Sequence, residues 1–168
     1  DLEALHNAVD RLSNASSITL CGLGASASVA QDAQHKLLRF PVPVMAHTDI
    51  INQRMAATGL REGDCLVCIS YTGRTTAMIE LAALAASGGA SVLGITAPHS
   101  PLAQECDLVL GVDAGEDTEL HTPMSSRIAQ LVIIDILATS MALARGEGFA
   151  EHLRRVKDNL ASTRRDKR

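Results

Sequence analysis

The chain has 168 residues, of which 46% are apolar but only 2% are aromatic, and its net charge is −4. A chain of this length forms about one domain, and its core must be built from Ala, Val, Ile and Leu, a composition that suits helices packed on a buried parallel sheet. The acidic balance excludes direct nucleic-acid binding by this chain, because such binding needs concentrated positive charge.

No segment has the features of a signal peptide, and we expect no apolar run to reach the ~20 residues that a bilayer-spanning helix needs. These features predict a cytoplasmic protein that does not contact a membrane. The sequence begins at Asp1 and not at a methionine, so we expect a fragment or a processed chain.

Apolar strand-like runs alternate with helical patterns along the whole chain. The expected helices cover residues 3–14, 26–39, 48–58, 75–87, a short stretch near 102, 124–145 and 149–168, with Thr48 or Asp49 as the N-cap of the third. The expected strands cover residues 18–22, 42–46, 64–70, 91–96 and 108–112. This alternation predicts an α/β fold with a doubly wound, five-stranded parallel sheet in the flavodoxin-like order 2-1-3-4-5. Ligands of such sheets bind beyond the carboxyl ends of strands 1 and 3.

Four cysteines raise the question of a metal or redox site, and Cys65 and Cys68 have C-x-x-C spacing. Positions three apart in a strand point to opposite faces of a sheet, so this pair is not expected to hold one ion. Cys21 lies in another expected strand, where a small buried thiol is an ordinary core residue. We therefore expect neither a metal nor a cofactor.

The expected helix 124–145 is apolar around far more than one stripe. A helix of this kind is buried on two sides, which indicates that the sheet covers one side and a second subunit covers the other. The sequence therefore predicts a homodimer or a higher homo-oligomer.

The loop after the third strand places hydroxyls and a glycine at the start of a helix, in the sequence Ser70-Tyr-Thr-Gly-Arg-Thr75. A helix start presents unpaired N–H groups and the positive end of the helix dipole, and both favour an anion. Three hydroxyls and the close approach that Gly73 allows indicate a phosphate. The alternative is that Thr72 or Thr75 only caps the helix.

The loop after the first strand contains Gly22, Gly24, Ser26 and Ser28. It resembles a dinucleotide-binding fingerprint, but Ala27 occupies the place of the third glycine, and no acidic residue closes the second strand. A nicotinamide cofactor is therefore not expected.

Together, Gly22-x-Gly24-x-Ser26 and Ser70-x-Thr72-Gly73-x-Thr75 resemble the two ligand loops of the sugar isomerase (SIS) domain, and the resemblance extends over almost the whole chain. Ala30-Gln-Asp-Ala-Gln-His-Lys36-Leu and Met124-Ser-Ser-Arg-Ile-Ala-Gln130 resemble the effector domain of RpiR-type bacterial transcription regulators, in particular repressors of hexose catabolism. The resemblance implies that residues 1–168 form one SIS effector-binding domain. It also implies an N-terminal helix-turn-helix domain, absent from this sequence, through which operator DNA would be bound.

The resemblance also implies the roles of individual residues. The phosphate loop falls on Ser70, Tyr71, Thr72 and Thr75, with Gly73 between them, and Tyr71 contributes mainly through its backbone N–H. Ser26, which follows Gly24, falls on the serine that contacts the sugar. Ser28 has no clear role in the family and could simply start a helix. Lys36 could reach inward or cover the surface, and we favour a structural role for it.

Isomerases of this fold need a carboxylate base, often with a histidine or a lysine. The candidates are Glu119 and His121, which precede the long helix. Glu119 could instead contact a ligand without catalysis, or be a solvated loop carboxylate. Arg127 could brace the start of the long helix or meet a ligand carboxylate.

Two functions are compatible with these residues. The first is a sensor that binds a phosphorylated sugar acid without changing it, and the second is a sugar-phosphate isomerase or lyase on the same fold. The resemblance to regulators favours the sensor, with no catalytic residues and with 2-keto-3-deoxy-6-phosphogluconate as the implied effector.

Overall fold

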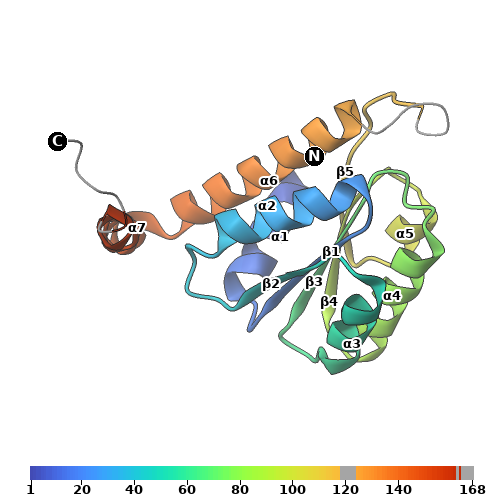
Figure 1. Ribbon diagram of the computed structural model, residues 1–168, viewed down its shortest axis with the longest axis horizontal. Coiled ribbons are helices and arrows are strands. Elements are labelled where there is room, and N and C mark those ends of the chain that lie inside the picture. Colours follow the sequence, from blue (N-terminus) through green and yellow to red (C-terminus); the bar gives the residue numbers. More distant parts are fainter. Residues whose placement is uncertain (118–123, 162, 164–168) are drawn as a thin grey trace.

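The computed structural model describes residues 1–117, 124–161 and 163 (Figure 1). Its helices are α1 (Leu2–Asn14), α2 (Ala25–Leu37), α3 (Ile50–Gly59), α4 (Thr76–Ser87), α5 (Pro101–Gln104), α6 (Ser125–Ala144) and α7 (Gly146–Ala161). Its strands are β1 (Ile18–Gly22), β2 (Val44–His47), β3 (Cys65–Ser70), β4 (Ser91–Thr96) and β5 (Leu108–Gly111). Each expected element within the described residues is present, with small shifts at the ends.

The five strands form one sheet in the order β2-β1-β3-β4-β5, and every neighbouring pair is parallel. The predicted strand order is therefore confirmed. The order reverses between β1 and β3, whose register pairs Gly22 with Ile69. The loops that follow these two strands consequently start side by side, at the edge of the sheet where ligands of this fold class bind.

Helices cover both faces of the sheet (Figure 1). On one face, α1, α2 and α6 pack on the sheet in a core that includes Leu12, Val29 and Ile134. On the other face, α3, α4 and α5 enclose a second core that includes Ala57, Leu81 and Leu102. The sheet is thus buried on both sides, as the apolar strand sequences require.

The cysteines follow the alternation of the strands. Cys65 belongs to the core under α1, α2 and α6, whereas Cys21 and Cys68 belong to the core under α3 and α4. The prediction that Cys65 and Cys68 point to opposite faces is confirmed. Burial raises the pKa of the Cys21 and Cys65 thiols to about 12, so both remain protonated at neutral pH.

Local chemistry explains where the elements on either side of residue 48 begin. β2 starts at Val44 and not at Val42, because Pro43 has no N–H to donate and contributes only its carbonyl, which accepts from Ile18 N at 2.8 Å. α3 begins after Asp49, whose carboxylate accepts from two backbone N–H groups of the first turn. Of the two N-caps considered, Asp49 is therefore the one that forms.

α6 is long and apolar enough, by length and composition, to cross a membrane, so the expectation that no run reaches this length was wrong. In this fold its inner side packs on the sheet, with Ile134, Leu137 and Met141 buried. Its Asp135 carboxylate accepts from Lys36 Nζ of α2 at 2.5 Å. In this fold, a helix of this length and hydropathy therefore packs on the sheet.

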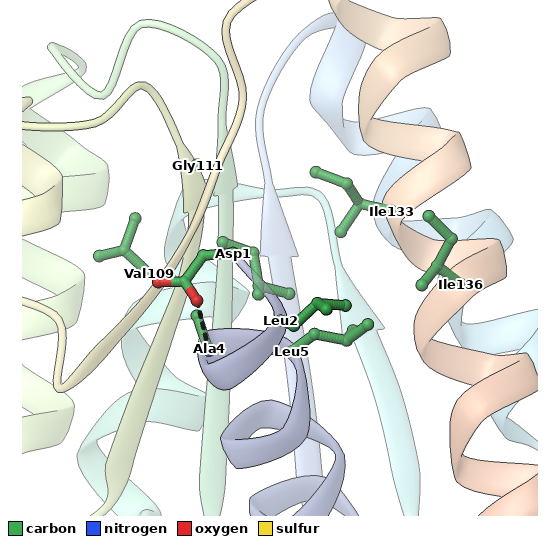
Figure 2. A pocket seen from close by; sticks show the side chains of 9 residues that line it. Asp1, Leu2, Ala4, Leu5, Val109, Gly111, Ile133 and Ile136 are labelled. Atoms are coloured by element: carbon green, nitrogen blue, oxygen red, sulfur yellow. Dashed lines mark hydrogen bonds between the residues drawn. The ribbon is translucent and has the colours of Figure 1, made fainter.

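The outer side of α6 is apolar and exposed, at Ile128, Val132 and Ile136. Beside it lies an apolar groove of about 270 Å³, where α1, β5 and α6 come together (Figure 2). Figure 2 shows the side chains of Leu2 and Leu5 on α1 facing Ile133 and Ile136 on α6 across this groove. Within one subunit, these apolar surfaces remain open to solvent.

Candidate functional site

A cavity of about 200 Å³ lies where the loops after β1 and β3 meet the first turns of α6. The residues around it come from these three segments: Leu23, Ala25 and Ser26; Ser70, Tyr71, Thr72 and Thr75; and Ser126, Arg127 and Gln130. Five of the eight expected site residues line it, namely Ser26, Ser70, Tyr71, Thr72 and Thr75. Within the described segments, the side chains lining this cavity include hydroxyls, an amide and a guanidinium but no carboxylate.

The β3 loop leads directly into α4. Ser70 ends β3 and is buried, and Thr75 is the N-cap of α4, but the Thr75 side chain makes no capping hydrogen bond. Among the described residues, Thr72 Oγ1 accepts one long contact, from Arg74 N at 3.4 Å. Neither threonine hydroxyl is therefore committed to a helix cap, which removes the simplest structural explanation for this group of hydroxyls.

Gly73 does not line the cavity, and the reason for a glycine there is packing. Its φ is 61°, and a Cβ at this position would collide with the side chains of Ser100 and Thr96. The same loop is fastened to its neighbours by hydrogen bonds from Ala97 N to Tyr71 O at 2.8 Å and from Leu102 N to Gly73 O at 3.0 Å. The absence of a side chain at Gly73 thus lets the loop pack closely against the end of β4 and the start of α5.

Gly24 likewise shapes its loop and does not line the cavity. It is the N-cap of α2 with a φ of 57°, a conformation that favours glycine even though a Cβ would meet open space. Two residues later, Ser26 Oγ donates to Gln130 Oε1 at 3.3 Å. Ser28 Oγ donates within α2, to Ala25 O at 2.7 Å, which is a local structural contact.

Tyr71 has a role that the sequence did not predict. Its ring packs against the core, and its hydroxyl oxygen accepts from Ala114 N at 3.2 Å and from Glu116 N at 3.3 Å. These bonds hold the segment after β5 against the β3 loop.

The side chain of Glu116 caps the N-terminus of α6. Its carboxylate accepts from Met124 N at 2.7 Å, Ser125 N at 3.0 Å and Ser126 N at 3.1 Å, and also from Ser126 Oγ. These hydrogen bonds, that of the Ser126 hydroxyl foremost, lower the pKa of Glu116 to about 2. The α6 start therefore already holds an anion that belongs to the chain itself.

Two cavity residues, Ser126 and Gln130, were missed by reasoning on individual residues, although both lie in the segment that carries the resemblance to regulators. They are four residues apart on the inner side of α6, and each is 1% exposed. Polar residues repeating every four positions along the buried side of an apolar helix are the signal that could have found them. Arg127, between them in sequence, also lines the cavity.

Three other candidates are not among the described residues that line this cavity. Glu119 and His121 lie outside the described residues. Lys36 Nζ pairs with Asp32 and Asp135, each at 2.5 Å, and thereby ties α2 to α6. Desolvation lowers the pKa of Lys36, but the hydrogen bonds with these carboxylates outweigh it and leave the pKa above its ordinary value. The structural role favoured for Lys36 agrees with these contacts.

Known proteins similar to this chain share its fold and much of its sequence. The HTH-type transcriptional regulator HexR of Pseudomonas aeruginosa is 51% identical over 164 residues, and HexR of Escherichia coli is 47% identical over 167 residues. These alignments cover 98% and 99% of this chain, and the chain spans 58% of the length of either relative. Both relatives are named as regulators and not as enzymes.

Among solved structures, the Vibrio vulnificus NanR protein complexed with ManNAc-6P superposes with a TM-score of 0.90 at 23% identity, over 99% of this chain and 63% of that one. At this identity the likeness shows a shared fold. The family model of the SIS domain matches residues 11–140, a range that contains the whole sheet and both loops of the cavity. This chain therefore belongs to the SIS domain family.

Proposed function

We propose that this chain is the ligand-sensing domain of a cytoplasmic transcriptional repressor of hexose catabolism, which binds a phosphorylated sugar acid and controls DNA binding. The observation that carries the proposal is the convergence of both hydroxyl-bearing loops on one cavity at the start of α4. The similarity to the HexR regulators supports the regulatory role.

The phosphate of the ligand would sit among the hydroxyls of Ser70, Thr72 and Thr75, facing the backbone of Tyr71 and the start of α4. A helix start with uncommitted hydroxyls around it is suited to an anion. Ser26 would contact the sugar, with Gly24 and Gly73 shaping the two loops. We further propose that Glu119, which lies outside the described residues, contacts the ligand.

Calorimetry of this domain tests the ligand. We expect 2-keto-3-deoxy-6-phosphogluconate to bind with micromolar affinity, about −7 to −8 kcal/mol, as suits a sensor of a metabolite. The unphosphorylated acid, 2-keto-3-deoxygluconate, should not bind measurably, because it lacks the phosphate that would bind at the start of α4. Equal binding of the two compounds would contradict the proposal.

The effect on DNA is tested in the whole protein. The HexR relatives are named HTH-type regulators, and we propose that a helix-turn-helix domain outside the present sequence supplies the DNA contacts. In a mobility-shift titration, effector should release the full-length protein from its operator, provided that it binds one arrangement of the dimer better than the other. An effector that leaves the complex intact would refute the repressor mechanism.

Incubation with sugar phosphates tests whether the domain is a sensor or an enzyme. Fructose 6-phosphate, glucosamine 6-phosphate and 2-keto-3-deoxy-6-phosphogluconate should each be recovered unchanged. Turnover that disappears in Glu119→Gln would instead identify an isomerase or a lyase, since a positioned base contributes about 10²–10⁴ to the rate.

We propose that the domain is a homodimer in which a second copy covers the outer side of α6. Ile128, Val132 and Ile136 form an exposed apolar stripe next to the groove of Figure 2, a surface that a second copy of the same chain would bury.

Light scattering on two variants tests the dimer. Ile136→Lys should give a folded monomer. Ile134→Lys should unfold the subunit, because Ile134 is 2% exposed within it. A wild-type monomer at micromolar concentration would contradict the proposal.

A further inference from the structure

Gln130 carries a buried side-chain amide, and of its two polar atoms only the oxygen has a hydrogen-bond partner among the described residues. Its side chain is 1% exposed and lines the cavity from the second turn of α6. Oε1 accepts from Ser26 Oγ at 3.3 Å, whereas Nε2 has no hydrogen-bond partner in the part of the chain that the structure describes. A residue that lines the cavity therefore carries an amide nitrogen with two unpaired hydrogens.

Packing does not account for an amide at this position. The residues that follow on the same side of α6, Ile134, Leu137 and Met141, are apolar and buried. A methionine at position 130 would continue that side with a similar volume and without an unpaired donor. Buried polar groups in folded proteins are almost always paired, and each exception calls for an explanation.

A second buried glutamine shows what a structural amide looks like in this fold. Gln53, also 1% exposed, donates from Nε2 to Gly22 O at 3.0 Å and to His47 O at 2.8 Å, and only its Oε1 is without a partner among the described residues. Both of its hydrogens join the ends of neighbouring strands β1 and β2. Gln130 has the same burial and lines a cavity, but its nitrogen has no partner among the described residues.

The groups around Gln130 indicate what it would bind. Ser26 fixes the amide by donating to Oε1, so Nε2 is directed away from Ser26. Arg127, on the same wall, has only donors. Nε2 and a guanidinium together match an acceptor-only oxygen, such as that of a carboxylate.

We propose that Gln130 Nε2 donates a hydrogen bond to the carboxylate of the sugar-acid ligand, at the end opposite the phosphate, and so makes the site selective for acids. This inference rests on the proposed function, because it assigns the second end of the same ligand. Ser26 acts on this end through Gln130, as the group that orients the amide.

Calorimetry with Gln130→Met and two probes tests the assignment. One probe, 2-keto-3-deoxy-6-phosphogluconate, carries a phosphate and a carboxylate, and the other, glycerol 3-phosphate, carries only the phosphate. Gln130→Met should weaken binding of the first by about tenfold and leave binding of the second unchanged. Ser70→Ala should weaken both, and Ser26→Ala should act like a milder Gln130→Met.

Thermal unfolding without ligand distinguishes recognition from structural support. Because Gln130→Met removes an unpaired buried donor, its Tm should equal or exceed that of the wild type, whereas Gln53→Met should have a lower Tm. A Gln130→Met protein that unfolds, or that loses both probes equally, overturns the assignment.

The two proposals fail in different ways. If the wild type binds neither probe, the proposed function fails, and this inference fails with it. If the wild type binds the sugar acid and Gln130→Met binds it equally well, only the role of Gln130 is wrong.

Discussion

Two of the helices that begin beside the cavity, α4 and α6, differ in how their N-termini are capped. At α6, the carboxylate of Glu116 accepts from three backbone N–H groups and from the Ser126 hydroxyl. At α4, the side chain of the N-cap Thr75 makes no capping hydrogen bond, and the neighbouring residues Ser70 and Thr72 line the cavity. The α6 start is therefore capped by a carboxylate of the chain itself, whereas the α4 start receives no capping hydrogen bond from the Thr75 side chain.

The difference separates a structural helix start from one suited to a ligand. Both starts offer N–H groups and the positive end of a helix dipole, so both favour negative charge. At α6 this preference is met inside the chain, which fixes the segment after β5. At α4 the N-cap side chain makes no such bond within the described part of the chain, and an external phosphate is a group that would suit this start.

The largest effect is expected when α4 is given its own anion, in Thr75→Asp. The new carboxylate should cap the helix and stabilise the domain by about 1 kcal/mol. It should also repel a phosphate by about 4 kcal/mol at 4 Å, a loss of about 1,000-fold in affinity. Calorimetry and thermal melts measure the two effects, and the neutral cap Thr75→Asn is the control for the charge. Phosphate binding that survives in Thr75→Asp would place the anion elsewhere.

Removing one hydroxyl from the α4 start should have the next largest effect. Ser70→Ala should weaken binding of 2-keto-3-deoxy-6-phosphogluconate by about 1.5–3 kcal/mol, because it deletes a hydrogen bond to a charged group. Thr76→Ala is the matched control, since Thr76 also begins α4 but does not line the cavity. If both variants bind equally, the hydroxyl of Ser70 does not contact the ligand.

Removing the charge from the α6 start should affect stability more than binding. Glu116→Gln keeps the shape of the side chain but loses the charge that faces three N–H groups, so the Tm at pH 7 should fall. Affinity for the sugar acid should change by less than about threefold, well below the effect of a lost hydrogen bond to the ligand. An unchanged Tm together with a large loss of affinity would mean that Glu116 belongs to the ligand site.

The smallest effect is the pH dependence of the same contact. Because the folded pKa of Glu116 is lowered from 4.5 to about 2, its stabilisation is complete above about pH 4.5 and is lost as the pH falls toward 2. Urea unfolding between pH 7 and pH 3 should therefore show wild type and Glu116→Gln converging in acid. A difference between the two proteins that stays constant over this range would contradict the lowered pKa.

Much of the fold and part of the site could be predicted from local patterns. The strand runs and their alternation with helices gave the correct sheet order, and the loops after β1 and β3 supplied five residues that line the cavity. For Gly73 the structure shows a further reason for glycine that the local pattern did not indicate, namely its close contact with Ser100 and Thr96. That α6 is long and apolar enough to cross a membrane was missed. Its apolar positions were interpreted only as evidence that the helix is buried on two sides.

The sequence by itself determined the sheet, its order and the two loops, because strand alternation, helix caps and turn residues are set by neighbours along the chain. Only the tertiary structure decided which residues close the cavity. Ser26 and Gln130 are 104 residues apart, and they meet because α6 packs beside α2 on one face of the sheet. The capping of α6 by Glu116, which lies on the segment after β5, likewise depends on how separate segments pack together.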